Sequence, residues 1–475
     1  MAWGRPGLVR DLFGIDVRSL AVFRVSLGVV LCWDLFDRML GIEAHYTQDG
    51  LVPAKLLQAL SVRPVYSLHL FSDTLNFQVL LFAVASAAAL MLLLGWRTRV
   101  ATLVSFVLIL SMHSRNPLTL HHGDTLLRVL LMWGVFLPLG ARASVDARRS
   151  LAATVASPVL SIGSAALMLQ GFFVYLIATI SKLQYDSWWD GRALYAVVHK
   201  ASYVRPLGEY LAQFPEVLEL FSHATLFVEG AIPVLFFSPW KRNGCRVAAV
   251  LLGLGLHAGI FAVVDVGTFQ PVTALALFPW LPASLWERLG WRLGDVDAKP
   301  WRPRWGSQAV AGLLLGYTLI SNALAIDVAQ RNMPEPLATV GYVLRLDQRW
   351  RMFANTDATQ QGWWVVTGKL ENGAPFDLLH GTPSVSLERP EHYYREMPNM
   401  AWRTYWANIS NEHYTPFRPA MGRYFCTSWN RNAEPKLRTS AVQVIYVVEH
   451  NYKAELGGIV RPRELVTTEC GESER

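Results

Sequence analysis

The sequence is short of charged residues. Only 17% of its 475 residues are Asp, Glu, Lys or Arg, whereas 52% are hydrophobic, and the mean hydropathy is +0.26. This composition is too apolar for a single soluble domain. The apolar residues are concentrated before residue 327 and become sparse after it. We therefore predict an α-helical integral membrane bundle over residues 1–330 and a small extramembrane α+β domain over residues 331–475.

Several signals of other protein classes are also missing. The start of the chain, MAWGRPGLVRDLFGIDVRSL, lacks the hydrophobic core and the small-residue cleavage site of a signal peptide, so we expect the first spanning helix to be retained. The chain has no internal repeat, which disfavours a transporter built from two related halves. The net charge of +7 is not gathered into a basic patch with interleaved aromatic residues. We therefore expect no nucleic-acid partner, because basic loops are usual in membrane proteins.

Nine apolar segments are candidates for crossing the bilayer, which requires about 20 residues of helix. The eighth is short, so it is expected to be buried or re-entrant. The nine segments are residues 20–39, 75–94, 100–112, 125–139, 159–180, 224–237, 247–264, 269–281 and 310–326.

The basic residues predict the orientation of these spans. If nine spans are counted, the Lys and Arg clusters all fall in loops on the same side as the N-terminus. Lys and Arg are enriched in cytoplasmic loops. We therefore expect a cytoplasmic N-terminus, an extracytoplasmic C-terminal domain and a location in a bacterial inner membrane. The loops 41–74 and 183–222 then share the outer side with that domain.

The C-terminal part has a different pattern. GWWVVTGKLENGAPFDLLH reads as two strands joined by a hairpin turn at Glu371-Asn372-Gly373, and the stretch from Ala441 reads as another strand. Cys426 and Cys470 lie in this domain, and an oxidising compartment would allow them to form a disulfide. Two unpaired thiols are an equally good interpretation, because spacing alone does not fix the connectivity of cysteines.

A lysine stands at the end of the fifth apolar segment, in VYLIATISKLQYDSWWDG. Lys182 is followed by the aromatic pair Trp188 and Trp189. Most lysines at this depth simply extend their ammonium group to water. The alternative is a desolvated lysine that acts as a general base.

Other polar residues are expected on the same outer side. His113, His121, His122 and Asp124 lie close together in the sequence, and Asp124 is placed to cap a helix that starts at Thr125. We predict no metal site there, because neither an HExxH nor a paired CxxC spacing is present. A cluster that faces Lys182 remains the other functional option.

Ionisable residues also occur inside three of the apolar segments. His257 and Glu229 are candidates for lining a polar cavity, because such residues usually face the interior of a bundle. Arg24 and Asp34 of the first segment are expected to be structural charges and could pair with those groups, since a buried charge without a partner is costly.

Several of these stretches together resemble vitamin K-dependent gamma-glutamyl carboxylase and its bacterial relatives, which share the HTTM domain. The similar stretches are VYLIA with SKL around Lys182, SLAVFRVSLGVVLCWDL, LHAGIFAVVDVGTFQPVTALALFPW and QRWRMF. The resemblance covers roughly residues 14–380. The carboxylase carries two adjacent lysines where this chain has Ser181 and Lys182.

The resemblance implies a reaction and its participants. In the carboxylase, the lysine that matches Lys182 deprotonates reduced vitamin K, O2 adds, and the strong base that results removes a proton from a substrate glutamate, to which CO2 adds. For this chain it implies reduced vitamin K or menaquinol as cofactor, O2 and CO2 as co-substrates, and an exported peptide or protein as substrate. A functional histidine of the family falls on His122 or, if the two sequences are matched without a gap, on Gly123.

Two functions therefore remain in view. The first is a quinol-dependent carboxylase-like enzyme with Lys182 and His122 as catalytic residues and His257, Trp188, Trp189, Glu229 and Asp124 around its cavity. The alternative is a non-enzymatic maturation or export partner, because a shared fold does not carry a reaction with it. The loss or retention of quinol oxidation when Lys182 is replaced by Ala distinguishes the two.

Overall fold

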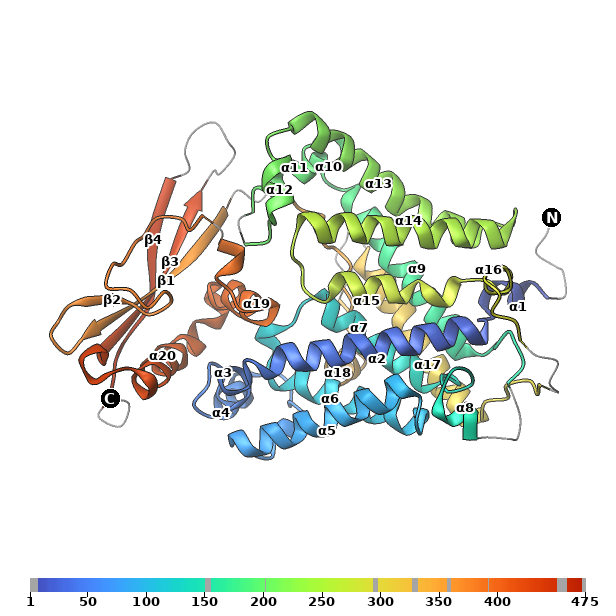
Figure 1. Cartoon of the computed structure of the whole chain (residues 1–475), viewed down its shortest axis with the longest axis horizontal. Coiled ribbons are helices and arrows are strands. Elements are labelled where there is room, and N and C mark those ends of the chain that lie inside the picture. Colours follow the sequence, from blue (N-terminus) through green and yellow to red (C-terminus); the bar gives the residue numbers. More distant parts are fainter. Residues whose placement is uncertain are drawn as a thin grey trace.

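The computed structural model describes residues 7–149, 155–200, 202–293, 298–326, 332–356, 360–391, 393–450 and 459–471. A bundle of helices forms most of the molecule, and a small sheet with two helices lies at one end of it (Figure 1). The N- and C-termini lie near opposite ends of the long axis (Figure 1).

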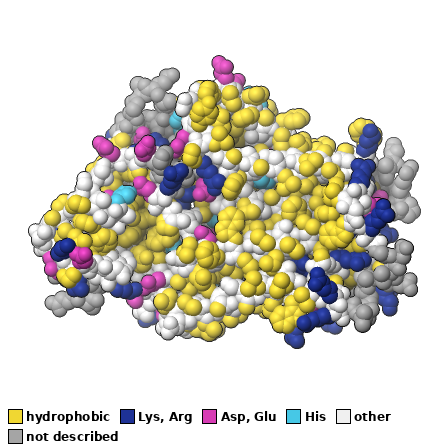
Figure 2. Space-filling model, viewed as in Figure 1, with side chains coloured by type: hydrophobic (Ala, Val, Ile, Leu, Met, Phe, Trp, Pro, Cys, Tyr) yellow, Lys and Arg dark blue, Asp and Glu magenta, His cyan; other side chains and the backbone are white. Residues whose placement is uncertain are grey.

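Within the described residues, six helices are long and apolar enough to cross a membrane. Each has 20 to 23 residues and is therefore at least about 30 Å long, the thickness of the hydrocarbon core of a bilayer. A wide apolar surface covers the body of the bundle, and Lys and Arg gather at the end that carries the N-terminus (Figure 2). The multi-pass membrane bundle is thus confirmed. The six helices are α2 (Val17–Met39), α5 (Leu75–Leu94), α9 (Ile162–Lys182), α13 (Pro215–Phe237), α14 (Arg242–Val263) and α17 (Trp305–Ala325).

The other three predicted spans are helical but do not meet these criteria, so a count of nine spans is not confirmed. α7 (His122–Val135) is about 21 Å long and α15 (Phe269–Ala276) about 12 Å, both shorter than the hydrocarbon core. α6 (Thr98–Arg115) ends in the polar residues His113, Ser114 and Arg115. Most of α7 is buried, and it packs against α6, α9 and α15. The apolar character of α7 and α15 therefore reflects burial inside the bundle.

Local sequence signals fix several ends of the long helices. α2 begins after Asp16, whose carboxylate accepts a hydrogen bond from the backbone N–H of Arg18 at 2.8 Å. α9 begins after Ser161, which exchanges hydrogen bonds with Ser164 in a capping box. α5 ends at Gly95, whose φ of 69° lies in the left-handed region that glycine adopts readily.

Short helices and turns cover the two ends of the bundle (Figure 1). The end near the sheet carries α3 (Ile42–Tyr46), α4 (Ala54–Leu60), α10 (Asp186–Trp189), α11 (Ala193–Val198) and α12 (Pro206–Leu211). The N-terminal end carries α1 (Leu8–Phe13), α8 (Val145–Arg149) and α16 (Ala283–Arg288). The 3-10 helices of the described residues are η1 (Leu68–Leu70), η2 (Pro117–Thr119), η3 (Phe278–Trp280), η4 (Tyr393–Arg395), η5 (Glu412–Phe417) and η6 (Pro435–Leu437).

The C-terminal domain is α+β, as predicted. Its antiparallel sheet has the order β2-β1-β3-β4, with β1 (Gln360–Leu370), β2 (Pro375–Asp377), β3 (Thr439–His450) and β4 (Ile459–Glu469). The predicted hairpin joins β1 to β2, and Gly373 supplies its positive φ of 85°. Helices α19 (Met400–Ile409) and α20 (Arg418–Asn432) pack on the sheet, where Trp406 lies 4.3 Å from Trp364 between ring centroids. Cys426 and Cys470 form a disulfide that ties α20 to the residue after β4.

The segment that leads to this domain is part of the bundle. After α18 (Glu335–Leu344), the side chains of Leu346 and Trp350 are fully buried in the same core as the spanning helices. The Gln348 carboxamide accepts a hydrogen bond from Gln170 of α9 at 2.9 Å. The predicted domain boundary at residues 330–331 lies outside the described residues, and the chain beyond it packs on the membrane helices up to about residue 354.

The C-terminal domain also contacts the bundle through α19. Asn399 donates a hydrogen bond to the backbone oxygen of Asp37 at 3.0 Å, and Arg403 donates one to the backbone oxygen of Asp265 at 2.8 Å. The ring of His45, from α3, lies 4.7 Å from that of Trp402. The domain is therefore held against the end of the bundle by both polar and aromatic contacts.

Candidate active-site cavity

A cavity of about 750 Å³ lies in the half of the bundle nearer the C-terminal domain. Side chains of α9, α13, α14 and α15 form its walls, together with residues of α10 to α12 and the segment Met352-Phe353. Most of the lining is apolar. The polar side chains that face it are Tyr175, Lys182, Thr225, Glu229, His257 and Gln270.

Lys182 and Glu229 form an ion pair in this cavity. The Lys182 Nζ atom lies 2.8 Å from Oε2 and donates a hydrogen bond of 3.1 Å to Oε1 of Glu229. Lys182 is the last residue of α9 and is 3% exposed, and Glu229 lies in the middle of α13 and is 7% exposed. Lys182 therefore does not extend to water, and its charge is balanced inside the protein.

Trp188 closes the cavity beside this pair. Its ring centroid is 5.2 Å from the Lys182 Nζ atom, and its Nε1–H donates to the backbone oxygens of Phe353 and Ala354, each at 3.1 Å. Phe353 has a φ of 52°, which is unusual for a bulky residue and persists only where surrounding contacts enforce it. The predicted neighbour Trp189 points elsewhere: it is exposed and donates to the backbone oxygen of Leu183.

A second polar group in the cavity consists of Tyr175, His257 and Gln270. The Nδ1 atom of His257 lies 2.6 Å from Oε1 of Gln270, and its Nε2 atom lies 2.8 Å from the Tyr175 hydroxyl. The Gln270 oxygen can only accept, so Nδ1 carries the proton and Nε2 accepts from the tyrosine. The lone pairs of the Tyr175 oxygen then remain free to accept a hydrogen bond from a ligand.

These two groups lie on one side of α9. Tyr175 and Lys182 are seven residues apart, or about 10.5 Å along the helix axis, and seven residues complete nearly two turns. The cavity can thus bind an apolar molecule with polar atoms at two separated places. It offers a carboxylate and an ammonium at one place and a phenol hydroxyl at the other.

The structure does not bring His122 into this group. His122 is the first residue of α7 and does not line the cavity. The prediction that Asp124 is the N-cap of this helix is also wrong. His121 is the N-cap, and Asp124, the third residue of the helix, accepts from the backbone N–H of His121 at 2.8 Å. The helix starts two residues earlier than Asp124 because the His121 ring and the Asp124 carboxylate satisfy its first N–H groups together.

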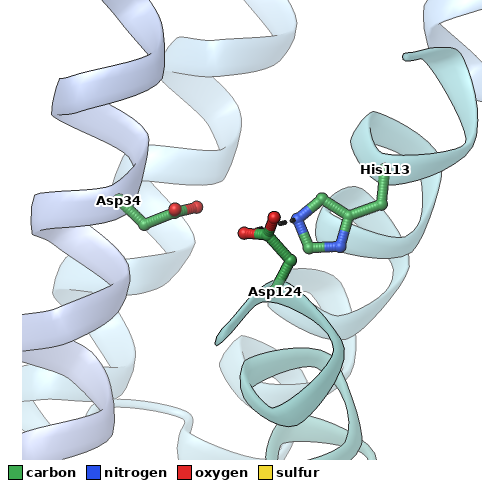
Figure 3. Close-up of side chains that lie close together, drawn as sticks. All are labelled: Asp34, His113 and Asp124. Carbon is green, nitrogen blue, oxygen red and sulfur yellow. Dashed lines mark ion pairs between the residues drawn. The ribbon is translucent and has the colours of Figure 1, made fainter. Parts of the chain in front are cut away.

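Asp124 belongs to a buried charge cluster next to α2. Asp34, His113 and Asp124 each offer a ligand atom within 4.8 Å of the others, and the His113 Nε2 atom is 3.8 Å from the Asp124 carboxylate (Figure 3). Arg38 pairs with both carboxylates, and its Nε atom is 3.0 Å from Asp34. The guanidinium therefore takes the place that a metal cation would need between the two carboxylates. This arrangement fits a structural role for Asp34.

Arg24, the other predicted structural charge, lies toward the opposite end of α2. It donates hydrogen bonds to the backbone oxygens of Arg142, at 3.4 Å, and Ala143, at 2.7 Å. Neither Arg24 nor Asp34 pairs with Glu229 or His257. Arg24 is instead bound by backbone oxygens that lie far along the chain, and Asp34 is paired with Arg38 of the same helix.

The lining residues that sequence reasoning missed include Tyr175, Gln270, Met352 and Phe353. Tyr175 carries one usable signal, since it lies two helical turns before Lys182 on the same face. Gln270 had been assigned to a short apolar segment without a role. Met352 and Phe353 belong to the QRWRMF stretch that resembles the carboxylase, but nothing local places them at the cavity, because they lie about 170 residues beyond Lys182 and reach it only through the folding of the chain.

Comparison with known proteins shows the family to which the chain belongs. No curated protein and no solved structure matches the chain. A family model does match: the HTTM domain model covers residues 14–286, which is more than half of the chain and includes Lys182, Glu229, His257 and Gln270. The chain therefore belongs to the HTTM domain family, with its candidate cavity almost wholly inside the matched region.

Proposed function

We propose that the protein is a carboxylase-like membrane enzyme. In this proposal it oxidises a reduced naphthoquinone, such as reduced vitamin K or menaquinol, with O2 and uses the reaction to carboxylate a glutamate-like residue of an exported peptide or protein. The HTTM domain also occurs in vitamin K-dependent carboxylase. The observation that carries the proposal is the buried Lys182–Glu229 pair in an apolar cavity.

The cavity fits the ring system of such a quinol. Its volume of about 750 Å³ falls in the usual range for small-molecule sites, which are mostly apolar with a few placed polar groups. A naphthoquinol has an apolar body and two hydroxyl groups on opposite sides of one ring. The hydroxyl of Tyr175 and the Lys182–Glu229 pair supply hydrogen-bonding partners for such groups.

The ion pair also provides a route to a basic lysine. Moving one proton from Lys182 to Glu229 gives a neutral amine beside a neutral carboxylic acid, and no proton has to leave the protein. The amine can then accept a proton from a quinol hydroxyl group, while Trp188 keeps water away on one side.

The proposal includes the orientation of the protein in the membrane. The N-terminal end, rich in Lys and Arg, would face the cytoplasm, and the C-terminal domain would face the extracytoplasmic side. The disulfide between Cys426 and Cys470 supports this arrangement, because disulfides persist in oxidising compartments. An exported substrate would then meet the enzyme on the side of the C-terminal domain.

A quinol-epoxidation assay tests the proposal. The protein, reconstituted in lipid, receives reduced naphthoquinone and O2; one oxygen atom ends in the quinone epoxide and the other in water. The wild type and Lys241→Ala should form epoxide, and Lys182→Ala should not. Lys241 is a suitable control because it lies at the start of α14, at the opposite end of the bundle.

Either of two results would contradict the proposal. Undiminished turnover by Lys182→Ala would remove the assigned base. A lack of epoxide from folded wild-type protein across several quinols would favour the alternative function, a non-enzymatic maturation or export partner. In that case an exported protein should co-purify equally well with the wild type and with Lys182→Ala.

A further inference from the structure

A second cavity lies at the N-terminal, basic end of the bundle. It has a volume of about 450 Å³, and three arginines line it: Arg97, Arg99 and Arg142. Its other walls include the apolar residues Val100, Pro138 and Val155. The cavity begins three residues after the end of α5, a candidate membrane span. It therefore lies where the hydrocarbon core would give way to lipid headgroups.

Two strained turns build this cavity. Arg97 has a φ of 44° and Ala143 a φ of 49°, a region that residues other than glycine seldom adopt. Asp146 fixes the first turn, because its carboxylate accepts from the backbone N–H groups of Arg97 and Thr98, each at 2.8 Å. Arg24 fixes the second turn through the backbone oxygen of Ala143. Strain of this kind persists where surrounding contacts enforce it and is common at ligand-binding sites.

The charges of the cavity are unbalanced. Asp146 is the one acidic residue among the described residues of its lining, and both of its oxygens are used by the start of α6, including a hydrogen bond of 2.6 Å from the Thr98 hydroxyl. Within the described part of the chain, none of the three arginine side chains forms an ion pair with a carboxylate. Arg99 instead packs over the ring of Trp301, 4.5 Å from its centroid. Among the described residues that line the cavity, three arginines therefore stand against the single carboxylate of Asp146, so the lining carries a net positive charge.

We propose that this cavity binds a phosphate group, supplied by the headgroup of an anionic phospholipid in the adjacent leaflet. Guanidinium groups match phosphate oxygens with paired hydrogen bonds, and basic pockets at the ends of membrane helices are suited to anionic lipid headgroups. The apolar walls would contact the glycerol and the first carbons of the acyl chains. The site is independent of the reaction proposed above, because it lies at the other end of the bundle from Lys182.

Native mass spectrometry of the full-length protein in detergent tests this inference. Phosphatidylglycerol should bind at least about tenfold more tightly than phosphatidylcholine, and the double variant Arg97→Gln, Arg142→Gln should lose most of that preference. The matched control is Arg148→Gln, Arg149→Gln, which removes the same charge from exposed residues of α8 that do not line the cavity. The control should keep the preference.

Two outcomes of this experiment would overturn the proposal, and two further measurements complete the test. An equal affinity for the two lipids in the wild type, or an equal loss in the control variant, would overturn the proposal, because it would reduce the effect to general surface charge. Arg99→Gln provides a milder variant in case the double variant does not fold. Inorganic phosphate serves as the competing probe: displacement of the lipid only at far higher concentration supports the lipid source, whereas displacement at equal concentration would overturn that source in favour of a free phosphate.

Discussion

Lys182 and Glu229 join α9 to α13 by an ion pair of 2.8 Å that is almost completely shielded from water. Removing both charges of such a pair is often tolerated, whereas removing one leaves the other buried and unpaired. This asymmetry separates the contribution of the pair to folding from its contribution to chemistry.

We expect Glu229→Gln and Lys182→Met each to destabilise the protein, by up to about 3–5 kcal/mol, and the double variant Lys182→Met, Glu229→Leu to recover much of that loss. Thermal unfolding in detergent measures these differences. The double variant should nevertheless be inactive in quinol oxidation. Additive losses in the double variant would show that the two side chains do not act as a pair.

Arg38 is expected to hold the buried carboxylates of Asp34 and Asp124 together. Arg38→Ala should destabilise the protein by several kcal/mol, because it leaves two like charges buried side by side. It should also free the ligand atoms of Asp34, His113 and Asp124 for a cation. We therefore expect Zn²⁺ to raise the unfolding temperature of Arg38→Ala but not that of the wild type. Equal responses would mean that Arg38 does not occupy the position between the carboxylates.

The disulfide should stabilise the C-terminal domain. Its two cysteines are 44 residues apart, and closing a loop of that length is worth up to about 4 kcal/mol. We expect Cys426→Ser, Cys470→Ser to unfold the domain at a lower temperature while the bundle remains folded, and limited proteolysis followed by mass spectrometry can localise the change. The matched control is Cys32→Ser, Cys245→Ser, which removes two free thiols. Equal protease resistance in both variants would contradict the prediction.

His380 should make a small contribution to stability that depends on pH. A hydrogen bond of 2.8 Å to the Asp377 carboxylate raises the pKa of His380 above its usual value, and Glu396 lies 3.3 Å from the other ring nitrogen. The stabilisation is therefore complete below the unfolded pKa of about 6.5 and is lost as the pH rises through the folded pKa.

The difference in unfolding free energy between the wild type and His380→Gln should accordingly be larger at pH 5.5 than at pH 9. It should stay below about 1 kcal/mol, because the side chain is 43% exposed and its charge is screened by water. Chemical denaturation at the two pH values measures it. A difference that grows with pH would have the wrong sign.

Local sequence patterns were sufficient for most of the helices. Residues 75–94 form α5 with the predicted bounds, because an apolar run of that length is a local property. The start of α13 was placed at residue 224 instead of Pro215, since Glu216, Glu219 and His223 interrupt the apolar run without interrupting the helix. The apolar run at residues 125–139 predicted a membrane span, but it belongs to the short, buried helix α7. Burial inside a bundle and contact with lipid both select apolar residues, so the run alone does not distinguish them.

The contacts within the candidate site could be identified only from the tertiary structure. Lys182, Glu229 and His257 were identified because ionisable residues are rare in apolar segments, but nothing local indicates that Lys182 and Glu229, 47 residues apart, face one another. The partner of Asp34 was missed although Arg38 lies four residues later on the same helix face, a spacing that favours an ion pair. The role of His122 is implied by the resemblance, and His122 is not among the described residues that line the cavity.

The part of the cavity wall formed by Met352 and Phe353 lies outside the matched HTTM domain. The HTTM match ends at residue 286, so the domain supplies the charged pair, the tyrosine–histidine group and most of the apolar lining, while this last wall comes from beyond it. A substitution at residue 352 or 353 reshapes the chamber without changing the chemistry-bearing residues. The shape of this cavity therefore depends in part on a segment that the domain itself does not contain.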